Sequence, residues 1–271
     1  MPEHLEPAIR KILQAFCGTD PGRSVVCEGH RPWRFRAAIA GDAPRPAASV
    51  MKIALAMAVY RAAADGRIDL DRLLPVSRFP PTRYVSILAA FDPDRTLTVR
   101  EICRLALITS DNPLAVHLAE LVGFDAVNAL LAAYGCGPPC AMAAGFSEPE
   151  LGARNRVNVL TADAAAVLLH AIWSEPLHAD LAIALTNNLR NHRIPALLPE
   201  HVQVMHKTGS LEGVVNDVGI VSDRDVAFTL AFLCDGQADA IQTSSEIAAC
   251  ARAVYDELKA RAAGRPGHGA P

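Results

Sequence analysis

The sequence contains 271 residues, of which 51% are hydrophobic and 20% charged, and its formal net charge is −3. A chain of this length can form one large domain or two interlocked lobes, and its composition is typical of a soluble globular protein. A net charge so close to zero argues against nucleic acid and anionic membranes as partners. No uninterrupted apolar run reaches the length of a bilayer span, so we expect no membrane partner.

The first seven residues are acidic and rich in proline. They lack the basic segment and apolar core of a signal peptide, which favours a cytoplasmic protein. A sequence that starts after a removed signal would look the same, and the protein would then be periplasmic or secreted.

Seven cysteines, an odd number, stand mostly in apolar helix-like or strand-like contexts. This pattern indicates reduced core thiols rather than a disulfide framework. Cys136 and Cys140 are separated by three residues, one more than in the common redox motif, and no second Cys/His pair at ligand spacing follows them. We therefore predict a proline-rich turn there, and no metal, nucleotide or flavin cofactor.

The predicted elements form a helix and short strands, then a long helical region, then strands and a final helix. In chain order they are a helix at 6–16, strands at 24–27 and 35–39, helices at 49–65, 99–108, 114–122, 125–134, 161–173 and 176–188, strands at 201–206, 214–221 and 226–233, and a helix at 241–261. Thr98 and Glu101 are spaced as a capping box for the helix that starts at residue 99.

This order predicts an α+β fold with an all-helical lobe inserted into it. Both chain ends would build one antiparallel sheet flanked by the terminal helices. Residues 1–43 with 200–271 would form the α/β lobe, and residues 44–199 the helical lobe. The active site is expected in the cleft between the two lobes, where small-molecule sites commonly lie.

Ser49 and Lys52 are the first candidates for catalysis. They stand three residues apart at the start of a predicted helix, so both side chains lie on one helical face. A hydroxyl with a basic group in reach, beside the positive end of a helix dipole, has what an activated nucleophile needs. On its own, the pattern also fits an N-cap serine followed by a solvated lysine.

Two later segments add polar groups at the ends of predicted elements. Ser-Asp-Asn at 110–112 lies at a break between two helices, where a loop can direct a hydroxyl and an amide into a cleft, although a capping turn fits the same residues. Lys-Thr-Gly-Ser at 207–210 closes a predicted strand whose edge would be open to a ligand. The alternative is a strand that simply ends in a glycine turn.

Ser-x-x-Lys, Ser-Asp-Asn and Lys-Thr-Gly are uncommon together in this order and at these separations. With this set, the sequence resembles the serine β-lactamase and penicillin-binding-protein superfamily, most closely the class A β-lactamases and related serine hydrolases. The resemblance spans nearly the whole chain, because the predicted element order also matches the two-lobed fold of that family. It implies a three-layer α/β/α arrangement of the β-lactamase/transpeptidase type beside the helical lobe.

The resemblance also implies a role for each matching residue. Ser49 would be the nucleophile that becomes acylated, and Lys52 a candidate acceptor of its proton. Ser110 would relay a proton to the leaving nitrogen. Asn112 would hold Lys52 and the substrate amide, and Lys207 would add positive potential.

The segment after Lys207 would contact the substrate. Thr208 and Ser210 would bind a substrate carboxylate, and the backbone N–H groups of Ser49 and Ser210 would form the oxyanion hole. Gly209 would allow a substrate to approach the strand edge without a Cβ in the way.

Hydrolysis of an acyl-enzyme needs an activated water, and class A enzymes use a loop glutamate for this. The segment 147–151 resembles that loop and nominates Glu148 as the general base, although a solvated acidic loop fits equally. The sequence departs from the family here, because Gly152 stands where an asparagine usually helps to hold the water. Phe146 stands where an arginine ties the loop down. These departures concern deacylation rather than acylation.

Three functions are compatible with these residues. The first is a hydrolase that opens a β-lactam amide through an acyl-serine intermediate. The second is a cytoplasmic amidase, esterase or peptidase of the same fold that acts on another acyl compound, which the lack of a visible signal peptide favours. The third is a penicillin-binding protein that deacylates slowly. Each takes a small-molecule substrate, and the oligomeric state is not predicted.

Overall fold

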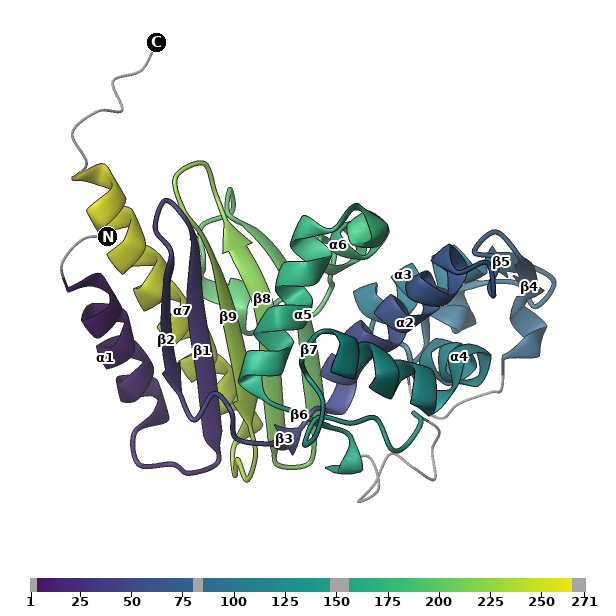
Figure 1. Ribbon diagram of the computed structural model, residues 1–271, viewed down its shortest axis with the longest axis horizontal. Coiled ribbons are helices and arrows are strands. Elements are labelled where there is room, and N and C mark those ends of the chain that lie inside the picture. The colour runs from purple at the N-terminus through teal and green to yellow at the C-terminus, as the bar shows by residue number, and fades with distance from the viewer. Residues whose placement is uncertain (1–3, 80–84, 147–155, 265–271) are drawn as a thin grey trace, which may run out of the picture.

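The computed structural model describes residues 4–79, 85–146 and 156–264. It contains a five-stranded sheet with helices on both faces and a group of helices beside it (Figure 1). The elements, in chain order, are α1 (Leu5–Cys17), β1 (Arg23–Arg31), β2 (Phe35–Ile39), β3 (Arg45–Pro46), the 3-10 turn η1 (Ala48–Met51), α2 (Lys52–Ala64), β4 (Leu73–Pro75), η2 (Val76–Arg78), η3 (Ile87–Ala90), β5 (Thr96–Thr98), α3 (Val99–Ile108), α4 (Asn112–Ala133), β6 (Val159–Leu160), α5 (Ala162–Ser174), η6 (Pro176–His178), α6 (Ala179–Thr186), η7 (Ile194–Leu197), β7 (Gln203–Leu211), β8 (Val214–Ser222), β9 (Ala227–Cys234) and α7 (Ala240–Ala263).

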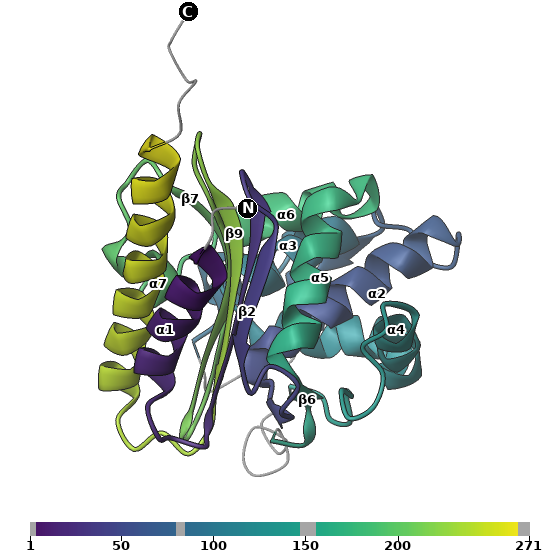
Figure 2. The same ribbon diagram turned by 60° about the vertical axis from the view of Figure 1, so that its left-hand side comes forward.

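The sheet confirms the predicted fold class. Its strand order is β2-β1-β9-β8-β7, and every neighbouring pair is antiparallel, so both chain ends supply strands. Helices α1 and α7 pack on one face and α5 on the other, which gives three layers (Figure 2). Strand β7 is an edge strand, and the turn η1 packs against it.

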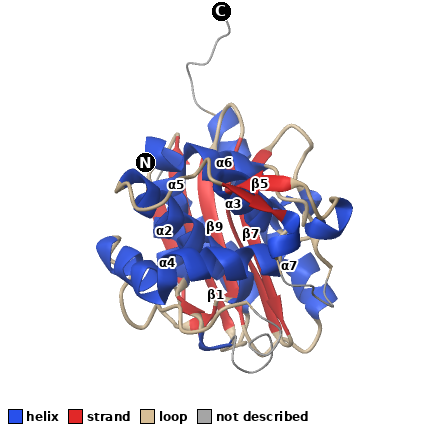
Figure 3. Cartoon of the chain, turned by 90° about the vertical axis from the view of Figure 1, so that its right-hand side faces the viewer, coloured by secondary structure: helices blue, strands red, loops and turns tan. Residues whose placement is uncertain are grey.

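Helix α2 lies at the centre of the helical group. Every one of its residues from Lys52 to Tyr60 is buried, and α3, α4 and η6 contact it. A helix without a polar face must be enclosed by other elements, and the helices in front of the strands in Figure 3 form this enclosure. Because Lys52 is the first residue of this helix, the fold buries its amine.

Helix α5 belongs to the range 44–199 and packs on β1, β8 and β9. It therefore supplies the second helical layer of the sandwich. The division of the chain into two lobes at these boundaries stays a prediction.

Several local features differ from the predictions. The short antiparallel pairs β3–β6 and β4–β5 were not predicted, because strands of two or three residues carry no periodic signal. The predicted strand at 201–206 is β7, which continues to Leu211 and pairs Gly209 with Asn216. The segment 207–210 thus lies within an edge strand, and the chain turns only after it. The predicted capping box of Thr98 and Glu101 is present.

Among the described residues, α4 is the one helix with the length and hydropathy of a membrane span. The expectation that no apolar run is long enough was therefore wrong. Gly123 has φ 74° and ψ 158°, a non-helical conformation that divides α4 into two helices, so the prediction that Gly123 separates two helices is confirmed. Core helices of folded domains meet the same criteria, and Leu114, Leu118 and Leu131 of α4 are buried in the core.

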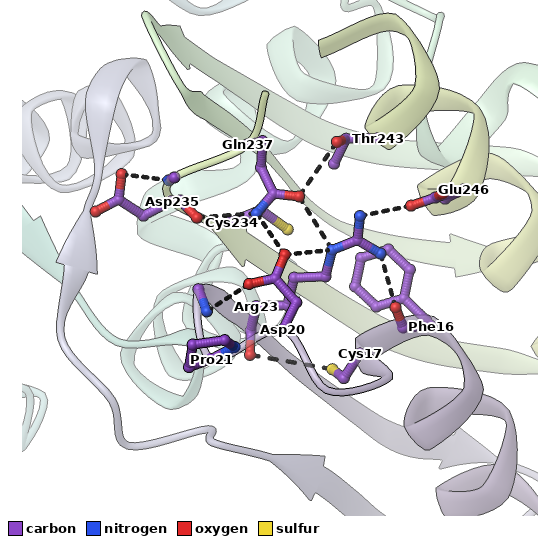
Figure 4. Close-up of polar contacts among 12 residues, drawn as sticks. Phe16, Cys17, Asp20, Pro21, Arg23, Cys234, Asp235, Gln237, Thr243 and Glu246 are labelled. Carbon is purple, nitrogen blue, oxygen red and sulfur yellow. Dashed lines mark hydrogen bonds and ion pairs between the residues drawn. The ribbon is translucent and has the colours of Figure 1, made fainter. Parts of the chain in front are cut away.

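Arg23 connects the outer helices to the sheet (Figure 4). Its guanidinium donates to Phe16 O at 2.8 Å and to Gln237 Oε1 at 3.0 Å. It also lies 2.6 Å from Glu246 Oε2 and 3.3 Å from Asp20 Oδ2. One side chain on β1 therefore holds the end of α1, the β9–α7 connection and α7 together.

We predict that Arg23→Ala destabilises the fold. The substitution leaves Gln237 and Glu246 without their cationic partner, and hydrogen bonds to charged groups contribute about 1.5 to 3 kcal/mol. Urea unfolding should show a loss of this size. Arg67→Ala is the control, because Arg67 forms an exposed pair with Asp65, and such pairs contribute about 1 kcal/mol or less. Equal losses in the two variants would contradict the assigned role of Arg23.

Candidate active site

Ser49 lies in η1, the tight turn between β3 and α2. Two hydrogen bonds fix the turn: Ala47 N donates to Asn158 O at 2.7 Å, and Asn216 Nδ2 donates to Ala47 O at 3.3 Å. Ala48 has φ 48°, a left-handed conformation that is costly for a residue with a Cβ and persists only where neighbours impose it. The half-buried Ser49 is thus presented on a rigid turn.

The Lys52 amine lies among oxygen atoms from three segments. Its Nζ donates to Asn112 Oδ1 and to Ser110 O, both at 2.7 Å, and lies 3.3 Å from Ser49 Oγ. No carboxylate of the described chain lies within ion-pair distance of this amine, whose residue is 1% exposed. The turn at 110–112 therefore positions Lys52 directly beside the Ser49 hydroxyl.

Ser110 lies between two buried amines. Lys207 Nζ donates to Ser110 Oγ at 2.9 Å, and Lys52 Nζ lies 3.5 Å from the same oxygen. Ser110 has φ 63°, which is again a left-handed conformation. A hydroxyl in this position can accept a proton from one side and donate one on the other.

Burial determines the charge of these amines. It lowers the pKa of Lys52 to about 7, a shift that the Asp111 carboxylate opposes and the Arg190 charge increases. Burial and the charges of Lys52 and Arg190 hold the pKa of Lys207 well below its usual value. Because the two amines repel each other when both are protonated, a neutral amine is available as a base near neutral pH.

The free edge of β7 faces this network. In an antiparallel strand, alternate residues direct both backbone groups to the same side. The carbonyls of His206 and Thr208 accept from Asn188 Nδ2 at 3.3 Å and Lys207 Nζ at 2.8 Å, so these residues direct their backbone away from β8. By the same alternation the N–H of Ser210 points away from β8. This is the orientation that the predicted oxyanion-hole role needs.

Gly209 is required by the turn that carries Ser49. A Cβ on Gly209 would lie 2.8 Å from Ala47 O and 3.1 Å from Val50 Cγ2. The sequence-based explanation, that the glycine leaves room for a substrate, stays a prediction, and these contacts give a second reason for a glycine here. The missing side chain allows β7 to approach the protein's own turn and brings the segment 207–210 beside Ser49.

Arg193 is a further residue of the site that the sequence did not predict. It is 3% exposed, and its guanidinium donates to Ser210 Oγ at 2.6 Å and to Gly209 O at 2.9 Å. A third bond joins it to Ser244 Oγ at 3.2 Å, which anchors it on α7. Arg193 thus fixes the Ser210 hydroxyl and adds a positive charge behind the strand edge. No spacing marked it, because its partners are distant in the sequence.

The comparisons with known proteins agree with this arrangement. Residues 4–258 match the family model described as "Beta-lactamase enzyme family". The chain belongs to the β-lactamase enzyme family. A hydrolase is therefore indicated at the level of the family, and the predicted resemblance to β-lactamases is confirmed.

Individual relatives of the family are distant in sequence and close in fold. A β-lactamase of Bacteroides uniformis is 25% identical over 239 residues, which are 79% of this chain and 79% of the relative. A class A β-lactamase of Bacteroides cellulosilyticus superimposes with a TM-score of 0.82 at 24% identity, covering 94% of this chain and 98% of the other. A PBP-A mutant in an acyl-enzyme complex with penicillin G superimposes with a TM-score of 0.80 at 20% identity, covering 94% and 97%.

In this β-lactamase family member, most of the predicted site residues lie close together in the described structure. A single hydrogen-bond network contains Ser49, Lys52, Ser110, Asn112 and Lys207. The residues 208–210 continue from it along the strand edge. Glu148, the rest of the segment 147–151 and Gly152 lie outside the described residues. Among the described residues, no cluster of three or more His, Cys, Asp or Glu side chains could hold a metal ion.

Phe146 contacts the catalytic candidate Lys52 directly, which the sequence did not predict. Its ring centroid lies 4.8 Å from Lys52 Nζ, and the side chain is 1% exposed. An aromatic face attracts an ammonium group and also keeps water from it. The residue at the position of the family's arginine therefore covers the Lys52 amine and contributes to its burial.

We predict that Gly209→Ala destabilises the protein by about 1 to 3 kcal/mol, because the new Cβ would overlap Ala47 O and Val50. Thermal or urea unfolding measures the loss. Gly137→Ala is the matched control, since its nearest neighbour would be Ala132 Cα at 4.0 Å, and it should change stability by about 1 kcal/mol at most. A Gly209→Ala protein as stable as the parent would refute the close approach.

Proposed function

We propose that this chain is a serine hydrolase that opens β-lactam amides through an acyl-serine intermediate, in the manner of class A β-lactamases. The observation that carries the proposal is the buried Lys52 amine within 3.3 Å of Ser49 Oγ, with a pKa lowered to about 7 by burial. An amine of this pKa can be neutral at physiological pH and can activate a neighbouring hydroxyl.

Acylation follows from the contacts of three side chains. Neutral Lys52 accepts the proton of the Ser49 hydroxyl as Ser49 Oγ forms a bond to the carbonyl carbon. The resulting oxyanion accepts hydrogen bonds from the N–H groups of Ser49 and Ser210. The C–N bond then breaks, and Ser110 donates its proton to the leaving nitrogen while it takes the proton held by Lys52. In a β-lactam this nitrogen stays attached through the opened ring.

The strand edge supplies the groups that would hold a substrate carboxylate. Thr208 and Ser210 offer hydroxyl donors, and Arg193 fixes the Ser210 hydroxyl from behind at 2.6 Å. Lys207 and Arg193 add positive potential. Both side chains are buried, so solvent screens their interaction with a substrate anion only weakly. A β-lactam with an anionic group beside its ring nitrogen fits this arrangement.

Deacylation is assigned to Glu148 as the general base that activates water. This role rests on the resemblance alone, because Glu148 lies outside the described residues. If deacylation is slow, the chain acts as a penicillin-binding protein instead, and the fold likeness to PBP-A supports that second candidate.

Intact mass spectrometry during incubation with a chromogenic cephalosporin tests the proposed function. We expect a mass adduct on Ser49 that forms and disappears as colour develops, and no adduct on Ser49→Ala. Ser245→Ala, on the outer helix α7, is the control and should match the parent. A persistent adduct without turnover would select the penicillin-binding candidate. Full activity of Ser49→Ala, or hydrolysis of simple esters alone, would refute β-lactam hydrolysis at Ser49.

The rate of acylation should rise with pH through a midpoint near 7. The neutral form of Lys52 is the base, and its fraction grows as pH increases through the lowered pKa. Lys52→Arg, which stays protonated, should lose about 100-fold or more in rate. Stopped-flow acylation at pH 5.5 to 9 measures both. Lys259→Arg, in an ion pair on α7, should keep the parent profile, and a parent-like rate in Lys52→Arg would exclude Lys52 as the base.

A further inference from the structure

A pocket of about 510 Å³ adjoins the Ser110 turn outside the network described above. Thr109 and Asp111, the two neighbours of Ser110, both line it. Its other lining residues come from η3 and the residues before it and from the turn after α6: Val85, Ser86, Ile87, Ala89, Ala90, Leu189 and Arg190. The pocket therefore lies beside the turn that carries Ser110, the residue that the proposed mechanism assigns to protonation of the leaving nitrogen.

Both walls of the pocket are attached to the Ser110 turn. On one side, Asp111 Oδ2 accepts from Ser86 Oγ at 2.6 Å and from Ile87 N at 2.9 Å. On the other side, Leu189 N donates to Ile108 O at 3.1 Å, and Arg190 Nε donates to Thr109 O at 3.3 Å. The pocket is thus preformed and fixed relative to Ser110, as a binding site for part of a substrate needs.

The mouth of the pocket exposes apolar surface. Val85 is 95% exposed and Leu189 69% exposed, and both line the same pocket. Ala89 and Ala90 are also exposed beside them. Apolar side chains that gather around a concavity favour an apolar group of a ligand.

Arg190 gives the pocket a positive charge. Its side chain is exposed, and no carboxylate of the described chain lies within ion-pair distance of it. It lies close enough to the reacting groups to lower the pKa values of Lys52 and Lys207. Asp111, the acidic residue of the lining, is 2% exposed, and its oxygens accept from Ser86, Ile87 and Leu114 N. An incoming anion would therefore meet Arg190 rather than Asp111.

We propose that this pocket binds the leaving-group half of the substrate and that it selects an apolar group that carries a negative charge. The assignment rests on the proposed function, because it uses the role of Ser110. Atoms bonded to a nitrogen that Ser110 protonates must lie next to this turn. This negative charge is distinct from the carboxylate assigned to Thr208 and Ser210.

The test compares three cephalosporins that share one acyl half. Each carries at C3 a phenylthiomethyl group, with a sulfonate, no charge or a trimethylammonium group on the ring. An exposed ion pair changes affinity by about 1.5- to 5-fold, so the parent should prefer the anionic over the cationic compound by about 2- to 25-fold in kcat/KM. In Arg190→Gln this ratio should approach one, and in Arg190→Glu it should invert.

The ratio between substrates is the decisive quantity, because loss of the Arg190 charge also alters Lys52 and Lys207 and so changes the rate with every substrate. Leu189→Asn should raise KM for the neutral compound, whereas Ile183→Ala should not, since Ile183 is an exposed apolar residue of α6 outside the lining. A ratio unchanged in Arg190→Glu would overturn the subsite while leaving the proposed function intact. If none of the compounds acylates Ser49, the proposed function is wrong and the subsite assignment with it.

Discussion

The site depends on two lysine amines that the fold buries around one serine hydroxyl. Lys52 is the first residue of a helix enclosed on all sides, and Lys207 lies on an inner position of the edge strand, so neither amine can reach solvent. Burial without a described carboxylate partner makes the charged form of both amines costly. The same cost lowers the pKa of Lys52 to about 7, which is what the proposed role of this amine as a base near neutral pH requires. The burial that lowers the pKa of Lys52 therefore also costs stability. The hydrogen bonds that its amine donates to Ser110 O and Asn112 Oδ1 offset part of this cost.

Three backbone constraints hold this arrangement. The η1 turn contains a left-handed Ala48 and is fixed by Asn158 and Asn216, while the turn between α3 and α4 contains a left-handed Ser110. Such conformations persist only where tertiary contacts impose them, and they cluster at functional sites. Gly209 then allows β7 to pack against η1 without a Cβ between them. Backbone geometry therefore positions the proposed nucleophile Ser49, the hydroxyl of Ser110 and the strand edge.

The sequence predicted the fold class and the residues of the network because both leave local signals. Apolar periodicity marked the long helices and the strands, and three short motifs marked Ser49, Ser110 and Lys207. The sequence missed what only the tertiary structure creates. Arg193 joins Ser210 to Ser244 across the sheet, and Phe146 covers Lys52 from a loop far along the chain. Such contacts have no fixed spacing. The prediction that the segment 207–210 closes a strand is confirmed, because β7 ends at Leu211, and the alternative of a glycine turn at this point is not.

Asp111 shows that the capping interpretation of the Ser-Asp-Asn motif and its proposed catalytic role are compatible. The capping interpretation is correct, since Asp111 Oδ1 accepts from Leu114 N at 3.1 Å and caps α4. Its other oxygen fixes Ser86 and Ile87, which form a wall of the pocket beside Ser110. Its charge also opposes the lowering of the Lys52 pKa. One buried carboxylate therefore couples the start of a helix, the shape of the proposed leaving-group subsite and the basicity of the proposed base. A substitution at residues 86–87 that moves the Asp111 carboxylate should therefore change the pKa of Lys52, although neither residue is hydrogen-bonded to that amine.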